Sequence, residues 1–262
     1  MKARKESILA KKSPLAERLD VVQEKIAAVC AKAKRDPSEV TLIAVTKYAA
    51  PEQIREIVQL GINDLGESRV QQLAQRAPQI NEFFARRAGL GSITPPKLRW
   101  HMIGHLQRNK IKAILPIVHI VHSIDSLRLA EELDIQCKKF DRKLPVMLQV
   151  NASEESSKHG VAVGAAVHLG EQIADMPNLQ LVGLMSMAPL TEDKEIIRKC
   201  FARTHEIFEE MRWHKIGKSG FKHLSMGMSH DYELAIAEGS TMVRIGTDLF
   251  GGKPEGIDEN DD

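Results

Sequence analysis

The chain has 262 residues, about the length of one α/β barrel and enough to bury a large core without a disulfide or a metal staple. Hydrophobic residues make up 43% and charged residues 27%, and 37 basic against 35 acidic residues give a net charge of +2. So small an excess argues against a dedicated nucleic-acid-binding protein. No apolar run reaches the roughly 18 residues of a membrane-spanning helix.

The cysteines indicate the cellular compartment of the protein, and the charged ends of the chain indicate where its domain begins and ends. Cys30, Cys137 and Cys200 lie far apart and form no CxxC pair. This spacing disfavours a zinc site or a disulfide framework and favours a reducing compartment, so we predict a cytoplasmic protein. The basic start lacks the apolar segment of a signal peptide. We predict one domain over 14–252, flanked by a basic tail (1–13) and an acidic tail (253–262).

Short β-rich runs alternate with amphipathic segments along the chain. A helix is predicted over 15–34, where apolar residues recur every three or four positions. The predicted strands are 41–46, 62–65, 98–103, 117–122, 144–150, 181–186, 222–225 and 242–245. The predicted helices between and after them are 51–60, 69–77, 108–115, 126–140, 161–175, 194–213 and 231–238. Long polar loops are predicted over 78–97 and 151–160.

Eight strands that alternate with helices predict a parallel α/β fold. That many strands in this length favours closure into a single (β/α)₈ (TIM) barrel. An open sheet of seven strands is the alternative, because 62–65 and 222–225 are short and weakly apolar. The first helix has no strand before it, so we expect it to pack outside the barrel or to cap one end.

A lysine follows the first predicted strand, at the barrel end where reactive groups usually lie. Lys47 is unusual there because burial of an unpaired ammonium group is costly. Desolvation lowers the pKa of an amine and makes it nucleophilic toward an aldehyde. The other interpretation is that Lys47 leaves the barrel and reaches water. Its position alone does not separate the two.

Glycines and hydroxyl residues follow the last two predicted strands, in 225–229 (SMGMS) and in 244–247 (RIGT). Loops at these places commonly bind phosphate in such barrels, because glycine lets the backbone approach an anion and helix N-termini offer free N–H groups. A lysine opposite a phosphate site predicts pyridoxal 5′-phosphate (PLP), held as a Schiff base on Lys47. Arg244 would face the ring nitrogen and keep it unprotonated, which weakens the ring as an electron sink; its alternative role is an ion pair at the barrel rim.

The pair His101 and His105 has a spacing found in metal sites. The segment is predicted as strand and turn, and no Glu follows His101, so we expect no metal site and favour a contact near the ligand. The sequence holds no Walker motif, GxSxG, HExxH or GxGxxG, which removes several common enzyme classes.

Several segments resemble the pyridoxal phosphate homeostasis proteins, a family similar to the N-terminal barrel of bacterial alanine racemases. They run in order over most of the chain: AVTKYAAPEQI (44–54), GINDLGESRVQQ (61–72), LRWHMIGHLQRNKIK (98–112), VHSIDSLRLAEEL (121–133), VNASEESSKHG (150–160), GLMSMAPL (183–190) and LSMGMSHDYELAIAEGSTMVRIGTDLFG (224–251). The last of these segments is the most specific.

The resemblance implies a type III PLP fold with the cofactor linked to Lys47. It also implies cofactor contacts, on the phosphate or around the ring, from Asn63, His101, Ser225, Met226, Gly227, Ser229, Arg244, Gly246 and Thr247, with Gln107 in the pocket wall. The family usually has Gly-Glu-Asn after the second strand, and this chain has Gly66-Glu67-Ser68. Serine reaches less far than asparagine, which weakens any contact made there.

The resemblance also implies a carrier that binds PLP and passes it on, to PLP-dependent apoenzymes, without turnover. A racemase needs a second base on the opposite face of the substrate carbon. The chain's tyrosines are Tyr48 and Tyr232; strand alternation predicts that Tyr48 points away from Lys47, and Tyr232 stays a candidate. We therefore predict a non-catalytic, monomeric PLP binder. The alternatives are a weak amino-acid racemase and an unrelated phosphate-ligand barrel with an aldolase-like Lys47.

Overall fold

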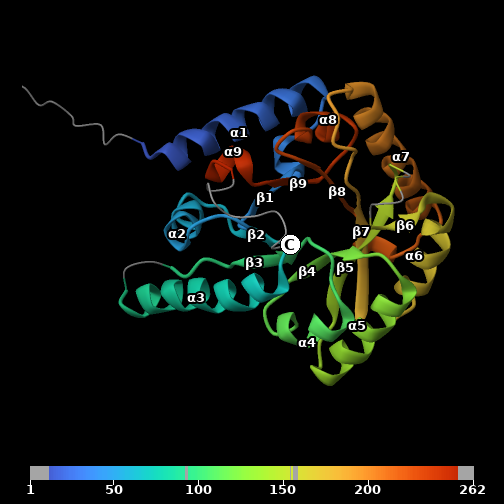
Figure 1. The fold of residues 1–262 in the computed structure, drawn as a ribbon, viewed down its shortest axis with the longest axis horizontal. Coiled ribbons are helices and arrows are strands. Elements are labelled where there is room, and N and C mark those ends of the chain that lie inside the picture. Colours follow the sequence, from blue (N-terminus) through green and yellow to red (C-terminus); the bar gives the residue numbers. More distant parts are fainter. Residues whose placement is uncertain (1–11, 92–93, 154, 156–158, 253–262) are drawn as a thin grey trace, which may run out of the picture.

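A computed structural model of the chain describes residues 12–91, 94–153, 155 and 159–252. Eight parallel strands form a closed barrel with helices around it (Figure 1). The barrel strands are β1 (Thr41–Val45), β2 (Asp64–Glu67), β3 (Arg99–Met102), β4 (Ile120–Ile124), β5 (Leu144–Asn151), β7 (Leu179–Met185), β8 (His223–Met228) and β9 (Met242–Ile245). Strand β1 pairs with β2 and with β9, and the pairing of β4 with β5 completes the ring. The predicted TIM barrel is confirmed, and the seven-strand open sheet is wrong.

The helices lie on the outside of the barrel (Figure 1). They are α1 (Pro14–Lys32), α2 (Pro51–Gln59), α3 (Val70–Gly89), α4 (Ile111–Ile114), α5 (Leu127–Lys139), α6 (Ala166–Ala174), α7 (Lys194–Trp213), α8 (Tyr232–Ala237) and α9 (Thr247–Phe250). A short strand, β6 (Val161–Ala162), pairs with the end of β5. Most of the basic tail and all of the acidic tail predicted from the sequence lie outside the described residues. None of the helices in the described ranges is long and apolar enough to cross a membrane.

Helix α1 packs outside the barrel, against α8 and α9. Ser13 caps its first turn by accepting a hydrogen bond from the Ala16 amide at 3.1 Å, and Pro14 occupies the first helical position. Arg18 ties the helix to α9 by donating to the Leu249 carbonyl at 2.6 Å. One face of α1 is buried, through Leu15, Leu19, Val22, Ile26 and Cys30.

Helix α3 continues through a segment that the sequence predicts as a loop. Pro78 lies inside the helix, where it removes one backbone hydrogen bond. The helix nevertheless runs on to Gly89 because its apolar face does: Ile80 and Phe84 are buried in line with the buried residues before Pro78. Burial of that face outweighs the lost hydrogen bond, so the prediction of a loop from residue 78 is wrong for 78–89.

Strand β2 lies two residues later than predicted, at Asp64–Glu67 instead of 62–65. All four residues are buried, and the first and last are acidic. Their charges are compensated locally: Asp64 pairs with Arg99, and Glu67 pairs with Arg76. The hydropathy of the segment therefore did not predict the correct bounds of the strand. The basic residues that compensate its two acids are distant in the sequence or lie on a helix. The shift places Asn63 before β2, at the N-terminal end of the barrel.

Candidate functional site

A cavity of about 430 Å³ opens at the C-terminal end of the barrel, where the loops that follow the strands meet. Its volume falls within the range of small-molecule sites. The lining combines apolar side chains with polar groups from β5, from β9 and from the loops after β1, β2, β3, β5, β8 and β9. The polar and charged lining residues are Lys47, Tyr48, Ser68, His105, Gln149, His159, Ser229, His230, Arg244 and Thr247.

Lys47 enters this cavity from the end of β1, and the residue before it is held rigidly. Thr46 is fully buried, and its hydroxyl donates to Glu67 Oε2 at 3.0 Å. Arg76 bridges the same groups, donating to Glu67 Oε2 at 2.9 Å and to the Thr46 carbonyl. The ends of β1 and β2 are thus joined by a buried ion pair, which fixes the backbone from which Lys47 projects.

The loops after β8 and β9 form the opposite wall. Ser229 lies between them, and its hydroxyl accepts from the amides of Gly246 and Asp248, each at 3.4 Å. Gly227 allows the turn into this loop, since its φ of +93° lies in the left-handed region. Ser229, Gly246 and Thr247 all line the cavity. Backbone amides, a hydroxyl and a short helix that starts at Thr247 are the groups that bind anions in proteins.

Arg244 lies deep in the cavity wall and is only 3% exposed. Its guanidinium donates to the Ser225 carbonyl at 2.8 Å, to the Ser225 hydroxyl at 2.7 Å and to the Ser186 carbonyl at 2.9 Å. Burial lowers the pKa of Arg244 to about 10, so the group stays charged at neutral pH. The cavity therefore contains a fixed cation that can donate a hydrogen bond but cannot accept one.

A chain of buried hydrogen bonds runs from Arg244 through the barrel to its N-terminal end. The Ser225 hydroxyl contacts His122 Nδ1 at 3.0 Å, and His122 Nε2 contacts His101 Nδ1 at 2.9 Å. His101 Nε2 contacts Asp64 Oδ1 at 3.0 Å. Burial raises the pKa of Asp64, but the hydrogen bonds from His101 and Arg99 outweigh it and lower the pKa to about 2. An ionised carboxylate thus anchors the far end of the chain and orients each member in turn.

The histidines of the barrel interior are held neutral by burial. Burial lowers the pKa of His101, and it lowers the pKa of His122 far below the usual range of a histidine. Burial, with the charge of Lys222 second, lowers the pKa of His223 from 6.5 to about 4. A neutral imidazole can donate through one nitrogen and accept through the other, as a chain that links Asp64 to Ser225 requires.

These shifts predict that acid destabilises the fold before the carboxylates titrate. Below pH 6.5 the unfolded chain binds protons that the folded histidines reject, so the free energy of unfolding falls as the pH drops from 6.5 to about 4. Urea unfolding across this range is expected to show a falling midpoint. His223→Gln should remove part of the slope, whereas His168→Gln, at an exposed site, should leave it unchanged. Equal slopes in the wild type and His223→Gln would contradict the assignment.

The structure brings five of the sequence-predicted residues to the cavity: Lys47, Ser229, Arg244, Gly246 and Thr247. The other six lie elsewhere. Asn63 precedes β2 at the opposite end, and His101 lines a separate pocket there while bonded to Asp64 and His122. Ser225 and Met226 are fully buried below the cavity, and Gly227 shapes the loop without lining it. Gln107, the predicted wall residue, lines a neighbouring pocket.

Two further lining residues were not among the predicted cofactor contacts. Tyr48 was predicted to point away from Lys47, but β1 ends at Val45, so strand alternation does not extend to it. Tyr48 lines the same cavity, and Lys47 Nζ lies 5.0 Å from the centre of its ring. Ser68 also lines the cavity, where its buried hydroxyl has no hydrogen-bond partner among the described residues. The resemblance to the family had indicated a contact at this position, where the family usually has asparagine and this chain has Ser68.

A closed parallel barrel, with a lysine after its first strand and hydroxyl groups and backbone amides in the loops after its last two, defines a class of protein. The model of that class, described as the alanine racemase N-terminal domain, matches residues 13–254. A pyridoxal phosphate homeostasis protein from Aquifex aeolicus is 36% identical over 235 residues, which cover 90% of this chain and 96% of the relative. The chain therefore belongs to the alanine racemase N-terminal domain family, as one of its pyridoxal phosphate homeostasis proteins.

Solved structures agree with this assignment. A protein of unknown function from Bifidobacterium adolescentis superposes with a TM-score of 0.84 at 32% identity, covering 90% of this chain and 94% of that one. PipY from Synechococcus elongatus PCC7942, solved with PLP bound, superposes with a TM-score of 0.71 at 32% identity. That match covers 90% of this chain and all of PipY.

Proposed function

We propose that this protein binds PLP in the cavity at the C-terminal end of the barrel, with Lys47 as the residue of covalent attachment, and that it holds and releases the cofactor without turning over a substrate. The observation that carries the proposal is the presence of Lys47, Ser229, Gly246 and Thr247 around one cavity of about 430 Å³. PipY, which was solved with PLP bound, and the homeostasis proteins among the relatives support the choice of ligand.

The residues of the cavity fit the proposed ligand. The buried hydroxyl of Ser68 has no partner within the described chain, so a polar ligand atom would satisfy a group whose isolation is otherwise costly. Ser229 and the Gly246–Thr247 backbone would hold the phosphate, and Lys47 would hold the aldehyde end. PLP supplies an aldehyde that an amine can bind reversibly, and a ring that can accept electrons.

Arg244 supports a carrier more than an enzyme. A guanidinium cannot take a proton from the ring nitrogen or give one up at neutral pH, so beside that nitrogen it would keep the ring neutral and a weak electron sink. The hydrogen bonds to Ser186 and Ser225 fix this cation in place. The anchored chain through His122 keeps Ser225 oriented toward Arg244.

Racemisation would need a second base facing Lys47 across the substrate carbon. Tyr48 is adjacent to Lys47 on the same segment, with its ring centre 5.0 Å from Nζ, which supports a place beside the amine and not across the substrate carbon from it. Tyr232 is 1% exposed and does not line the cavity, and burial raises its pKa to about 12. Neither tyrosine is placed as the opposing base.

Tyr232→Phe is expected to keep the free energy of unfolding unchanged or raise it by about 1 kcal/mol, because the buried hydroxyl has no hydrogen-bond partner in the described chain. PLP binding should be unaffected. Urea unfolding and cofactor titration provide the measurements. A loss of stability above about 1 kcal/mol would mean that the hydroxyl has a bonding role.

Two experiments test the function: transfer of PLP to an apoenzyme, and racemisation of amino acids. Protein loaded with PLP is mixed with an apo form of a PLP-dependent enzyme, and the recovered activity is compared with that from free PLP at the same concentration. A carrier restores activity and racemises none of a panel of amino acids above the rate of Lys47→Ala. Racemisation well above that control would favour the weak racemase instead. We further propose that the protein acts as a monomer in the cytoplasm, where its three buried cysteines stay reduced.

A further inference from the structure

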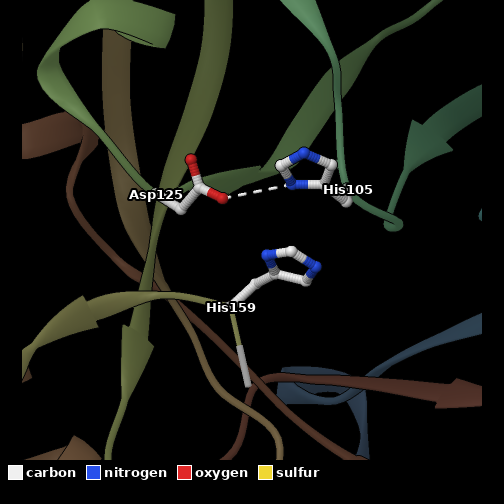
Figure 2. A group of neighbouring side chains, drawn as sticks. All are labelled: His105, Asp125 and His159. Carbon is white, nitrogen blue, oxygen red and sulfur yellow. Dashed lines mark ion pairs between the residues drawn. The ribbon is translucent and has the colours of Figure 1, made fainter. Parts of the chain in front are cut away.

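Three side chains with metal-binding atoms meet at the edge of the cavity, and the proposed function uses none of them. His105 lies in the loop after β3, Asp125 directly follows β4, and His159 lies between β5 and β6. Figure 2 shows the carboxylate of Asp125 and the two imidazole rings gathered around one small region. The residues are distant in the sequence, and three consecutive barrel strands bring them together at the same end.

Their spacing is close to that of a coordination site. Asp125 Oδ2 lies 3.2 Å from His105 Nδ1, and the rings of His105 and His159 stack with centres 4.3 Å apart (Figure 2). One donor atom from each residue lies within 4.8 Å of the other two. Ligands at 2.0–2.2 Å from a tetrahedral zinc ion are about 3.3 Å apart. The His105–Asp125 pair already has this spacing, and the exposed ring of His159 would have to turn to bring its donor nitrogen to the same ion.

The surroundings favour a site that exchanges with solvent. The Asp125 side chain is 13% exposed, and its other oxygen, Oδ1, accepts from the Ser126 hydroxyl at 3.3 Å. Such a contact orients a metal-binding carboxylate. The His105 side chain is 42% exposed, which leaves a route for an ion to enter. His105 and His159 also line the main cavity, so an ion bound here would form part of its wall.

We propose that His105, Asp125 and His159 bind a divalent transition-metal ion, zinc by the chemistry of the donors. Two imidazoles and one carboxylate are the donor set of zinc sites that keep a fourth position open for water or an exchangeable anion. The ion joins the loops after β3, β4 and β5 at the cavity mouth. This site does not depend on PLP binding or on the carrier role.

Metal titration of the tag-free protein tests the site. Calorimetry with Zn²⁺ is expected to give one saturable site, and Co²⁺ is expected to give the visible bands of a tetrahedral nitrogen–oxygen site. Asp125→Asn and His159→Ala should each lower the Zn²⁺ affinity by at least about 100-fold. His168→Ala is the matched control, because His168 is an exposed imidazole 3.6 Å from Glu171 with no third donor grouped beside it in the described chain. It should leave the affinity unchanged.

The same titration on Lys47→Ala separates this site from the proposed function, since Zn²⁺ binding should persist there. Circular dichroism of each variant checks that the fold is intact. Protons compete for the imidazole nitrogens, so the affinity should fall as the pH is lowered. The proposal is overturned if the wild type shows no saturable Zn²⁺ site, or if Asp125→Asn and His159→Ala bind Zn²⁺ as tightly as His168→Ala does.

Discussion

Lys47→Ala is expected to abolish covalent retention of PLP. Of the lysines that the structure describes, Lys47 lines the cavity together with Ser229, Gly246 and Thr247, so an aldehyde whose phosphate binds that wall would meet this amine. Borohydride reduction followed by peptide mass spectrometry should find one modified lysine in the wild type, at position 47, and none in the variant. The visible absorbance of the bound cofactor should disappear with it.

The control for this prediction is Lys199→Ala, at an exposed position on α7. It should bind and retain PLP as the wild type does. Lys47→Ala should still bind free phosphate compounds weakly, because the anion-binding wall is intact. Labelling at another lysine in the wild type, or full retention of PLP by Lys47→Ala, would contradict the assignment.

Gly227→Ala is expected to destabilise the fold strongly and to disturb the cavity wall. The φ of Gly227 is +93°, and an added Cβ would lie 2.8 Å from Tyr232 Cα and 2.6 Å from Ala235 Cβ. Backbone strain and overpacking together should lower the free energy of unfolding by about 2–4 kcal/mol. The displaced loop carries Ser229, so phosphate binding should weaken as well. Urea unfolding and PLP titration measure the two effects.

Gly164→Ala is the matched control, because an added Cβ there meets nothing within 4 Å. It should change the free energy of unfolding by less than about 1 kcal/mol. If Gly227→Ala were equally mild, the left-handed turn before Ser229 would not be needed to shape the anion-binding wall.

The barrel could be predicted from the sequence because hydrophobic periodicity records burial directly. Runs such as 41–46 and 144–150 are apolar since both faces of a barrel strand are covered. Strand β2 was misplaced because its two buried acids are neutralised by Arg99 and Arg76, partners that the local pattern does not reveal. Asn63, which the resemblance to the family implied as a cofactor contact, lies before this strand, at the other end of the barrel.

The site was predicted less completely than the fold, for a geometric reason. Lys47 and Arg244 could be placed because strand ends determine where they emerge. The direction of a loop side chain depends on contacts made far along the chain, as Tyr48 shows by turning toward Lys47 after β1 has ended. The grouping of His105 with His159 depends on the closure of three loops over consecutive strands. The spacing of residues in the sequence does not indicate that these two histidines lie together.

The pairing of β1 with β9 has a consequence for how the protein is made. Thr41 and Met242 are neighbours in the sheet, so the first strand to leave the ribosome waits for the last before the ring can close. The wall around Ser229 and Thr247 is also absent until nearly the whole chain has been synthesised. Under the proposed function, a nascent chain would expose Lys47 before the proposed phosphate-binding groups have formed, and capture of the vitamin-derived ligand would begin only after translation ends.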